Sequence, residues 1–376
     1  MIAFLLMLAA VIAGAEFLSL RRGLGGVEYD LRLSKTIAEP DEPLQLISVI
    51  TNRRRRILSF LRLNENVPDA LNVEGELRTE SVSQRRSALR STVYMMPRQR
   101  LTRRTPFTAP RRGRYLFLGA TLEGGDFMGL STASRQVELL RELVILPRRV
   151  EAARIQQLMG GWMGDRSVNR FIMEDPVLTL GYRDYTGREP MKQIAWTQTA
   201  RLGRMMVRCQ DYTVERTVTV MLNANTFAFG SYGARMLEAA LALCRGVCEA
   251  LEEQRIPYAF ISNARCLGMP DGFGEVGDGL GKAHLATVLE GLGRADSTFR
   301  DTLEGLFDRA LSRAAVGRGH IFITPVRNDL HPELLQRLRA ATGEAPLSIT
   351  GEDLDVELPG DAPPRADAEL RFVPAE

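Results

Sequence analysis

The stretch from Gly181 to Asn225 reads GYRDYTGREPMKQIAWTQTARLGRMMVRCQDYTVERTVTVMLNAN, and it decides the fold of the chain. Most of the stretch follows neither the helical nor the strand period of apolar residues. It ends in the apolar run Val218 to Leu222, which predicts a buried strand. We therefore expect a long segment of mixed polarity, folded ahead of the first strand of a sheet.

After this stretch the patterns of strand and helix alternate. The sequence predicts strand 217–222, helix 234–253, strand 258–261, helices 281–292 and 298–315, strand 320–325, helix 331–342 and strand 347–350. Alternation of this kind is typical of an α/β domain, a doubly wound and mostly parallel sheet with helices on both faces. We assign residues 181–350 to this domain.

The first half of the chain has a different pattern. From Val27 to Leu146, short runs of alternating polarity are separated by turn clusters such as Glu39 to Pro43. This predicts an immunoglobulin-like β-sandwich over residues 25–150. Residues 151–180, with glycines at 160, 161 and 164, are expected to form a connector and not a rigid helix. The acidic, Pro-rich residues 351–376 are expected to form a disordered tail.

The run from Met1 to Leu20 is apolar apart from Glu16 and Ser19. About twenty such residues are enough to span a bilayer as a helix, so we expect a transmembrane anchor at 1–20. A cleaved signal peptide is the alternative, because Ala13-Gly14-Ala15 resembles a cleavage site, but a basic start is missing. Arg21 and Arg22 then favour a single-pass protein of the inner membrane with its domains in the cytoplasm.

Part of the quoted stretch resembles the signature of the family called domain of unknown function 58 (DUF 58). That signature has an Arg-x-Tyr, a Gly-Asp-Asp, an Arg-x-Ile-Asp-Trp and an Ala-Arg. The matching positions here are Arg183, Tyr185, Gly187, Lys192, Ile194, Trp196, Ala200 and Arg201. Four departures are visible: Glu189 and Pro190 replace the acidic pair, Lys192 replaces the Arg, Ala195 replaces the Asp before Trp, and Gly187 lies one place early.

The resemblance implies a C-terminal domain like that of von Willebrand factor A. It also implies a partner, an AAA+ ATPase of the MoxR type, with which such proteins are commonly encoded. On this basis we expect a non-catalytic, membrane-anchored binding or assembly module that works on a client complex or in cell-envelope processes. The alternative is a hydrolase acting on cell-envelope material, since cell-envelope genes often accompany the family.

The same resemblance allows a test for metal binding. Metal-binding domains of this type place Asp-x-Ser-x-Ser after the first strand, which supplies oxygen ligands for Mg²⁺. The aligned positions here hold Asn223, Asn225 and Phe227, so we expect no metal. We also expect no cofactor, because Gly277 to Lys282 lacks the spacing of a phosphate loop. We expect no catalytic residue, because Gly230 to Gly233 lacks a glycine that a nucleophile elbow requires and the histidines have no HExxH spacing.

Charge is distributed unevenly along the chain. Residues 21–150 carry 24 Lys and Arg against 14 Asp and Glu, although the net charge of the whole chain is only +3. The arginines have no aromatic stacking platform beside them, so we do not expect nucleic acid as a partner. Attraction to anionic membrane lipid is one interpretation, and a solvated loop is the other.

Trp196 and its flanking arginines form the densest group of polar and aromatic residues. One interpretation is structural, with Trp196 buried together with Ile194 and Tyr185 and with the arginines paired to acidic groups. The other is a surface for a partner. We favour the structural interpretation from the sequence, and it requires a buried Trp196.

Overall fold

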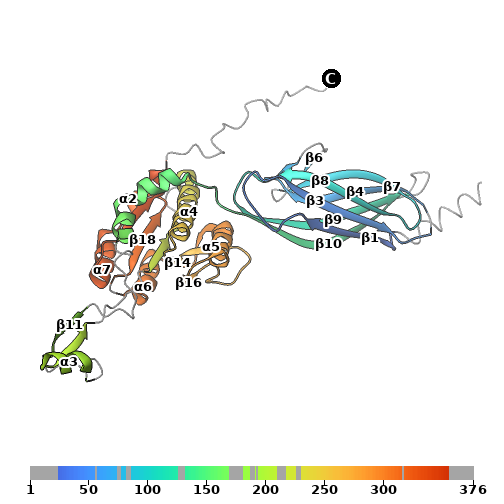
Figure 1. Cartoon of the computed structure of the whole chain (residues 1–376). Coiled ribbons are helices and arrows are strands. Elements are labelled where there is room, and N and C mark those ends of the chain that lie inside the picture. Colours follow the sequence, from blue (N-terminus) through green and yellow to red (C-terminus); the bar gives the residue numbers. More distant parts are fainter. Residues whose placement is uncertain are drawn as a thin grey trace, which may run out of the picture.

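The structure is a computed structural model of the chain, and it describes residues 24–354 except 56, 74–77, 82–85, 126–131, 169–180, 187–190, 192–193, 210–216, 226–229 and 316. Strands make up 41% of it. Two units lie end to end, an elongated β-sandwich and a unit that contains most of the helices (Figure 1).

The sandwich consists of two sheets. The four-stranded sheet has the order β1-β3-β8-β5, with β1 Val27–Leu33, β3 Leu44–Asn52, β8 Arg100–Thr108 and β5 Asn72–Val73. The six-stranded sheet has the order β2-β10-β9-β4-β7-β6, with β2 Ile37–Ala38, β10 Thr132–Ile145, β9 Gly113–Gly125, β4 Leu58–Pro68, β7 Arg86–Met95 and β6 Arg78–Ser81. All pairs are antiparallel except β2 with β10.

Alternation along the strands explains the core of the sandwich. In β1, Val27, Tyr29 and Leu31 are buried, while the residues between them are partly or fully exposed. Successive side chains of a strand point to opposite faces, so each strand contributes one row to the core. Arginines from β10 cover the edge of β1: Arg135 donates to the carbonyl of Leu24 over 3.2 Å, and Arg141 Nε donates to that of Leu31 over 2.8 Å.

The second unit is built on a five-stranded sheet of order β16-β14-β13-β18-β19. Its strands are β16 Val276–Gly279, β14 Tyr258–Ser262, β13 Val218–Leu222, β18 Gly319–Thr324 and β19 Leu347–Thr350. The last four are parallel, and the edge strand β16 is antiparallel to β14. All five residues of β13 are buried, as expected for the centre of a sheet covered on both faces.

Helices cover the two faces. Helices α2 Ala152–Val168, α4 Gly230–Glu253 and α5 Lys282–Arg294 share one apolar cluster with Val218, Val220 and Leu222 of β13. Helices α6 Leu303–Ser312 and α7 Pro332–Thr342 share another with Met221. Two short 3₁₀ helices are η3 Arg327–Asp329 and η4 Gly351–Asp353.

Two small sheets complete the described chain. One pairs β15 Ala264–Cys266 with β17 Ala295–Phe299 beside α5. The other pairs β11 Gly181–Asp184 with β12 Met206–Cys209, and helix α3 Trp196–Leu202 lies between them in sequence. Figure 1 shows the β11–α3–β12 unit apart from the five-stranded sheet, on the side away from the sandwich.

Arginines join the sandwich to the helical unit. Arg245 of α4 is fully buried, and its two terminal nitrogens donate to Glu39 over 2.6 and 2.7 Å. The guanidinium also donates to the carbonyl of Pro147 and to Glu249. Arg112, just before β9, donates to Glu238 of α4 over 2.6 Å. The junction therefore depends on charged hydrogen bonds, which are about twice as strong as neutral ones.

The expected fold class is wrong as a whole and needs correction. The described chain is mostly β. Within the described ranges, no helix combines the length and the apolar character that crossing a membrane requires. The predicted transmembrane anchor at 1–20 lies outside the described residues.

Three boundaries also differ from expectation. The predicted connector begins with helix α2, because Ile155 and Met159, four residues apart, are buried on α4. The predicted helix 298–315 is divided: β17 extends to Phe299, and α6 starts at Leu303, where the Thr302 hydroxyl caps Gly305 N. The predicted tail 351–376 begins with the ordered helix η4, and the rest of that predicted tail, 355–376, lies outside the described residues.

The junction leads to a prediction about pH. The hydrogen bonds from Arg245 hold the pKa of Glu39 below its ordinary value of 4.5. A carboxyl group whose folded pKa is lowered contributes stability above its unfolded pKa, and this contribution is lost as the pH falls through the folded pKa. We expect Glu39→Gln to lower the free energy of unfolding by about 1–3 kcal/mol at pH 7, and the difference from wild type should shrink below pH 4.5.

Denaturant titrations at pH 7, 5 and 3.5 measure this difference. Glu28→Gln is a matched control, because Glu28 is exposed and pairs with the exposed Arg53 at the other end of the sandwich. A Glu39→Gln protein as stable as wild type at pH 7 would contradict the role given to the junction.

Candidate functional site

The residues of the quoted motif build the β11–α3–β12 unit. In β11, Arg183 and Asp184 pair with Val207 and Met206 of β12. Ile194 bridges to Val207 from the other side, and Ala195 N donates to the carbonyl of Met206 over 2.8 Å. These contacts place β12 at the centre of the unit. The buried residues of the unit form a small core: Ile194, Ala195, Met206 and Val207.

Helix α3 packs on β12 through one polar contact. The Thr199 hydroxyl accepts a hydrogen bond from Met206 N over 3.0 Å. The helix ends at Gly203, whose φ of 66° suits glycine and lets its N–H bond to the carbonyl of Thr199. None of the seven residues of α3 is buried. In the described residues the helix is therefore held by its ends and by the Thr199 hydroxyl, and most of its side chains are exposed.

The exposure of Trp196 contradicts the structural interpretation that the sequence favoured. Trp196 is 58% exposed, whereas Ile194, two residues before it, is 3% exposed. The expected burial of Trp196 is therefore wrong, and the expected burial of Ile194 is confirmed. Tyr185 is half-buried, and Arg183, Ala200 and Arg201 are exposed. Gly187 and Lys192 lie outside the described residues.

Several large apolar side chains of the unit are exposed to solvent and do not take part in its core. Met191, 68% exposed, accompanies Trp196, and the other large exposed apolar side chains of the unit are Tyr182, Leu202 and Met205. Arginines lie among them: Arg204 pairs with Asp184 over 3.1 Å, and Arg201 is exposed. Trp, Tyr, Met and Arg are the residues enriched at protein interfaces. The arrangement has the composition of a protein-binding surface.

A second group lies at the carboxyl ends of the parallel strands. Asn223, buried directly after β13, donates through Nδ2 to Thr324 Oγ1 over 3.1 Å and to Asp329 over 3.2 Å. Its Oδ1 accepts from Asn263 Nδ2 over 2.9 Å and from Asn225 N over 3.1 Å. The amide of Asn223 thus joins three strand ends, which is a structural role.

Little in this group suits a metal ion. Burial raises the pKa of Asp329, and this effect outweighs the lowering of the pKa by the hydrogen bonds that the carboxylate accepts. The described residues contain no cluster of three or more His, Cys, Asp or Glu placed to hold a metal. Asn225 is half-buried, and Phe227, the third of the degenerate metal-site positions, lies outside the described residues. The amide oxygen that would face an ion is already an acceptor within the protein.

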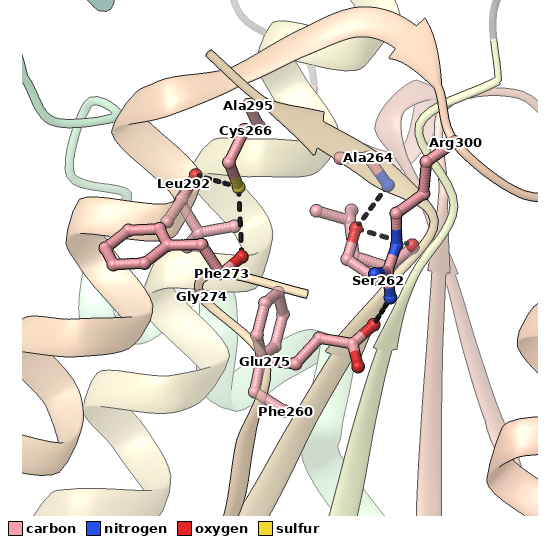
Figure 2. Close-up of a pocket in the computed structure, with 12 residues that line it drawn as sticks. Phe260, Ser262, Ala264, Cys266, Phe273, Gly274, Glu275, Leu292, Ala295 and Arg300 are labelled. Atoms are coloured by element: carbon pink, nitrogen blue, oxygen red, sulfur yellow. Dashed lines mark hydrogen bonds and ion pairs between the residues drawn. The ribbon is translucent and has the colours of Figure 1, made fainter. Parts of the chain in front are cut away.

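A small pocket lies beside this edge, between β14, β15 and α5 (Figure 2). Its volume of about 10 Å³ leaves room for roughly one water molecule. The Cys266 thiol donates to the carbonyls of Phe273 and Gly291 over 3.1 and 3.5 Å. Burial raises the pKa of Cys266 to about 11, so the thiol is neutral at pH 7 and is a poor nucleophile.

The hydroxyl of Ser262 in the same pocket is occupied too. It donates to the carbonyl of Leu222 over 3.1 Å and accepts from Ala264 N over 3.0 Å. The charged pair Glu275 and Arg300 lies beside Ser262, away from Cys266, as Figure 2 shows. The Ser262 hydroxyl and the Cys266 thiol both make hydrogen bonds to backbone groups, and neither is paired with a general base in the described part of the chain. The pocket therefore lacks the activated nucleophile of a hydrolytic site.

Comparisons with known proteins leave the chain without an assigned family. No family model matches it, and no curated protein matches it. The resemblance to DUF 58, to von Willebrand factor A domains and to partners of MoxR-type ATPases therefore has no support beyond the residues quoted above. The predicted transmembrane helix also has no support, since no helix of the described residues is long and apolar enough to cross a membrane.

Solved structures give only weak similarity. A β-glucosidase from Erythrobacter marinus is 7% identical with a TM-score of 0.19, covering 32% of this chain and 15% of that one. A cohesin module from a family 33 glycoside hydrolase of Clostridium perfringens is 9% identical with a TM-score of 0.23, covering 32% and 96%. The sporulation control protein Spo0M from Bacillus subtilis is 13% identical with a TM-score of 0.20, covering 43% and 58%. Scores this low support no inference about fold or function.

The strand-end network predicts a pH-dependent effect of Asn223→Asp. The substitution places a second carboxyl group about 3.2 Å from Asp329, and two such groups raise the pKa of one of them. A raised folded pKa costs stability as the pH rises. We expect a melting temperature several degrees below wild type at pH 7 and a smaller loss at pH 4.5. Equal losses at both values would contradict the network.

A second prediction concerns magnesium. In the resemblance to von Willebrand factor A domains, Asn223 and Asn225 replace the carboxylate and the hydroxyl of a metal site, so we expect millimolar Mg²⁺ to leave the melting temperature unchanged. Binding at a hundred times the Kd would add about 2.7 kcal/mol of stability. Thermal unfolding with Mg²⁺, and with EDTA as control, distinguishes the two outcomes.

Proposed function

We propose that this chain is a non-catalytic binding or assembly module and that its β11–α3–β12 unit is the surface that binds a protein partner. The exposure of Trp196 on a helix with no buried residue carries this proposal. Truncating a central Trp of an interface often costs 2 kcal/mol or more of binding energy, about a 30-fold loss of affinity. In a monomer, such a residue would stay in contact with water.

The partner that the sequence resemblance implies is an AAA+ ATPase of the MoxR type. The β11–α3–β12 unit can bind a protein partner, because the exposed Arg201 can pair with an acidic side chain beside an apolar centre. In this proposal the ATPase acts on a client, and the chain presents the client or tethers the ATPase. The work would take place at the cytoplasmic face of the inner membrane, and no spanning helix is part of the proposal.

The described residues give no support to the alternative that the chain is a hydrolase. Cys266 and Ser262 make hydrogen bonds to the backbone, as shown above. No observation in the described ranges therefore favours this function over binding.

Three substitutions test the proposal. Trp196→Ala should leave the free energy of unfolding within about 0.5 kcal/mol of wild type, since the side chain is mostly exposed. It should also weaken association with a MoxR-type ATPase about 30-fold, measured by calorimetry or by pull-down with the purified ATPase. Ile194→Ala, in the core of the unit, should instead lose about 2–5 kcal/mol locally, measured by proteolysis of the unit.

Leu140→Ala is the matched surface control, because Leu140 is similarly exposed but lies on β10 of the sandwich. It should change neither stability nor association. Normal association by the Trp196→Ala protein would reject the proposed surface, and lower stability of that protein would restore the structural interpretation.

A further inference from the structure

The end of the sandwich away from the helical unit is built from two loops that are hydrogen-bonded to each other. One loop follows β3 at Asn52, and the other is the turn from Met96 to Gln99 between β7 and β8. Asn52 N donates to the carbonyl of Gln99, and Asn52 Nδ2 donates to that of Met96, both over 2.9 Å. Arg98 N donates to the carbonyl of Arg54 over 3.0 Å. The loops thus form one surface, called the tip below.

The turn holds an arginine in an unfavourable conformation. Gln99 N donates to the carbonyl of Met96, so Pro97 and Arg98 are the central residues of the turn. Arg98 has a φ of 56°, a value at which glycine or asparagine is usual. Non-glycine residues in this region cluster at binding sites. Here the conformation keeps the Arg98 side chain exposed at the tip.

Three large apolar side chains are exposed at the same place. Tyr94 is 72% exposed and Ile57 is 60% exposed, and Met96 is exposed as well. Tyr94 lies in β7 next to the last residue of the strand, the buried Met95, and Met96 follows directly after it. Because Leu58 pairs with Met95, Ile57 lies beside Met96. The apolar residues form a group and are not scattered.

Arginines lie on the same two loops and at the start of β8. The described arginines of the tip are Arg53, Arg54, Arg55, Arg98 and Arg100. Among the described residues that lie beside Arg98 and Arg100, the acidic ones are Glu28 and Asp30, and Glu28 is already paired with Arg53 over 2.6 Å. The tip therefore has an excess of positive charge.

The start of the fold lies at the tip as well. Arg53 N donates to the carbonyl of Gly26, and Arg54 Nε donates to that of Gly25 over 2.9 Å. The residues that precede Gly25 therefore join the fold here, and their sequence from Ile2 to Leu20 is almost wholly apolar.

We propose that the tip docks on the surface of an anionic phospholipid bilayer. Tyr94, Ile57 and Met96 would enter the headgroup region, where aromatic and apolar side chains are favoured. The arginines would contact lipid phosphates, to which basic residues near a membrane surface are attracted. A nucleic acid would use the arginines but would leave Ile57 and Met96 without a contact. This docking is a surface contact, independent of the partner surface on α3.

The test uses the full-length chain with vesicles of phosphatidylcholine alone or with phosphatidylglycerol at about a third of the lipid. The apolar N-terminal run can bind both kinds of vesicle, so the readout must be local to the tip. Hydrogen exchange should slow in residues 93–100 on the anionic vesicles and not on the neutral ones. High salt should reduce this protection, because surface charge is screened.

Substitutions separate the tip from the rest of the chain. The double variant Arg98→Gln with Arg100→Gln should lower the ratio of anionic to neutral vesicle binding about 30-fold. Tyr94→Ser with Met96→Ser should abolish the protection of residues 93–100. Arg337→Gln with Arg339→Gln, which removes the same charge from α7, is the control and should behave as wild type.

Melting temperatures equal to wild type confirm that each variant folds. A folded Arg98 and Arg100 variant that keeps the preference for anionic vesicles would overturn the proposal. Slow exchange at the tip with a single-stranded oligonucleotide, and none with anionic vesicles, would overturn it in favour of nucleic acid.

Discussion

The buried guanidinium of Arg245 is the contact on which the arrangement of the two units depends. Arg245 lies on α4, whose apolar face covers the central strands, and its donors reach Glu39 and Pro147 of the sandwich. Burial of a charge is costly unless all its donors are satisfied. Any rotation of the sandwich against α4 would separate these groups and leave the charge uncompensated. The ion pair therefore fixes an orientation more than it adds stability.

The same principle recurs at the other contacts of the junction. Arg294 of α5 bonds to Glu142 of β10 and to Glu290, and Arg112 donates to the carbonyls of Leu292 and Gly293 at the end of α5. Each planar guanidinium makes several bonds of fixed direction, so each restrains two elements at once. Inside the sandwich, Tyr29 donates to the buried Glu65 over 2.6 Å, and burial raises the pKa of Tyr29. Polar contacts thus set geometry where apolar packing alone would allow sliding.

Sequence patterns predicted the local elements better than the contacts between them. The apolar run at Val218 to Leu222 forms β13, because a central strand needs no polar face. The junction arginines gave no such signal: Arg245 and Glu39 are 206 residues apart, and each resembles a surface charge in its own segment. The failed expectation for Trp196 has a related cause. Its size suggested burial, but a helix of seven residues beside a core of four small and medium side chains cannot cover an indole ring.

The distribution of exposed apolar residues follows from this arrangement. Where the two units meet, Arg245 is fully buried against Glu39. Among the described residues, most of the large apolar side chains that are more than half exposed lie at two other places, the tip with Tyr94 and the α3 surface with Trp196. Exposed aromatic residues add nothing to the stability of a monomer, since their burial is what supplies free energy. The two exposed apolar places therefore belong to different parts of the fold, the tip to the sandwich and the α3 surface to the β11–α3–β12 unit.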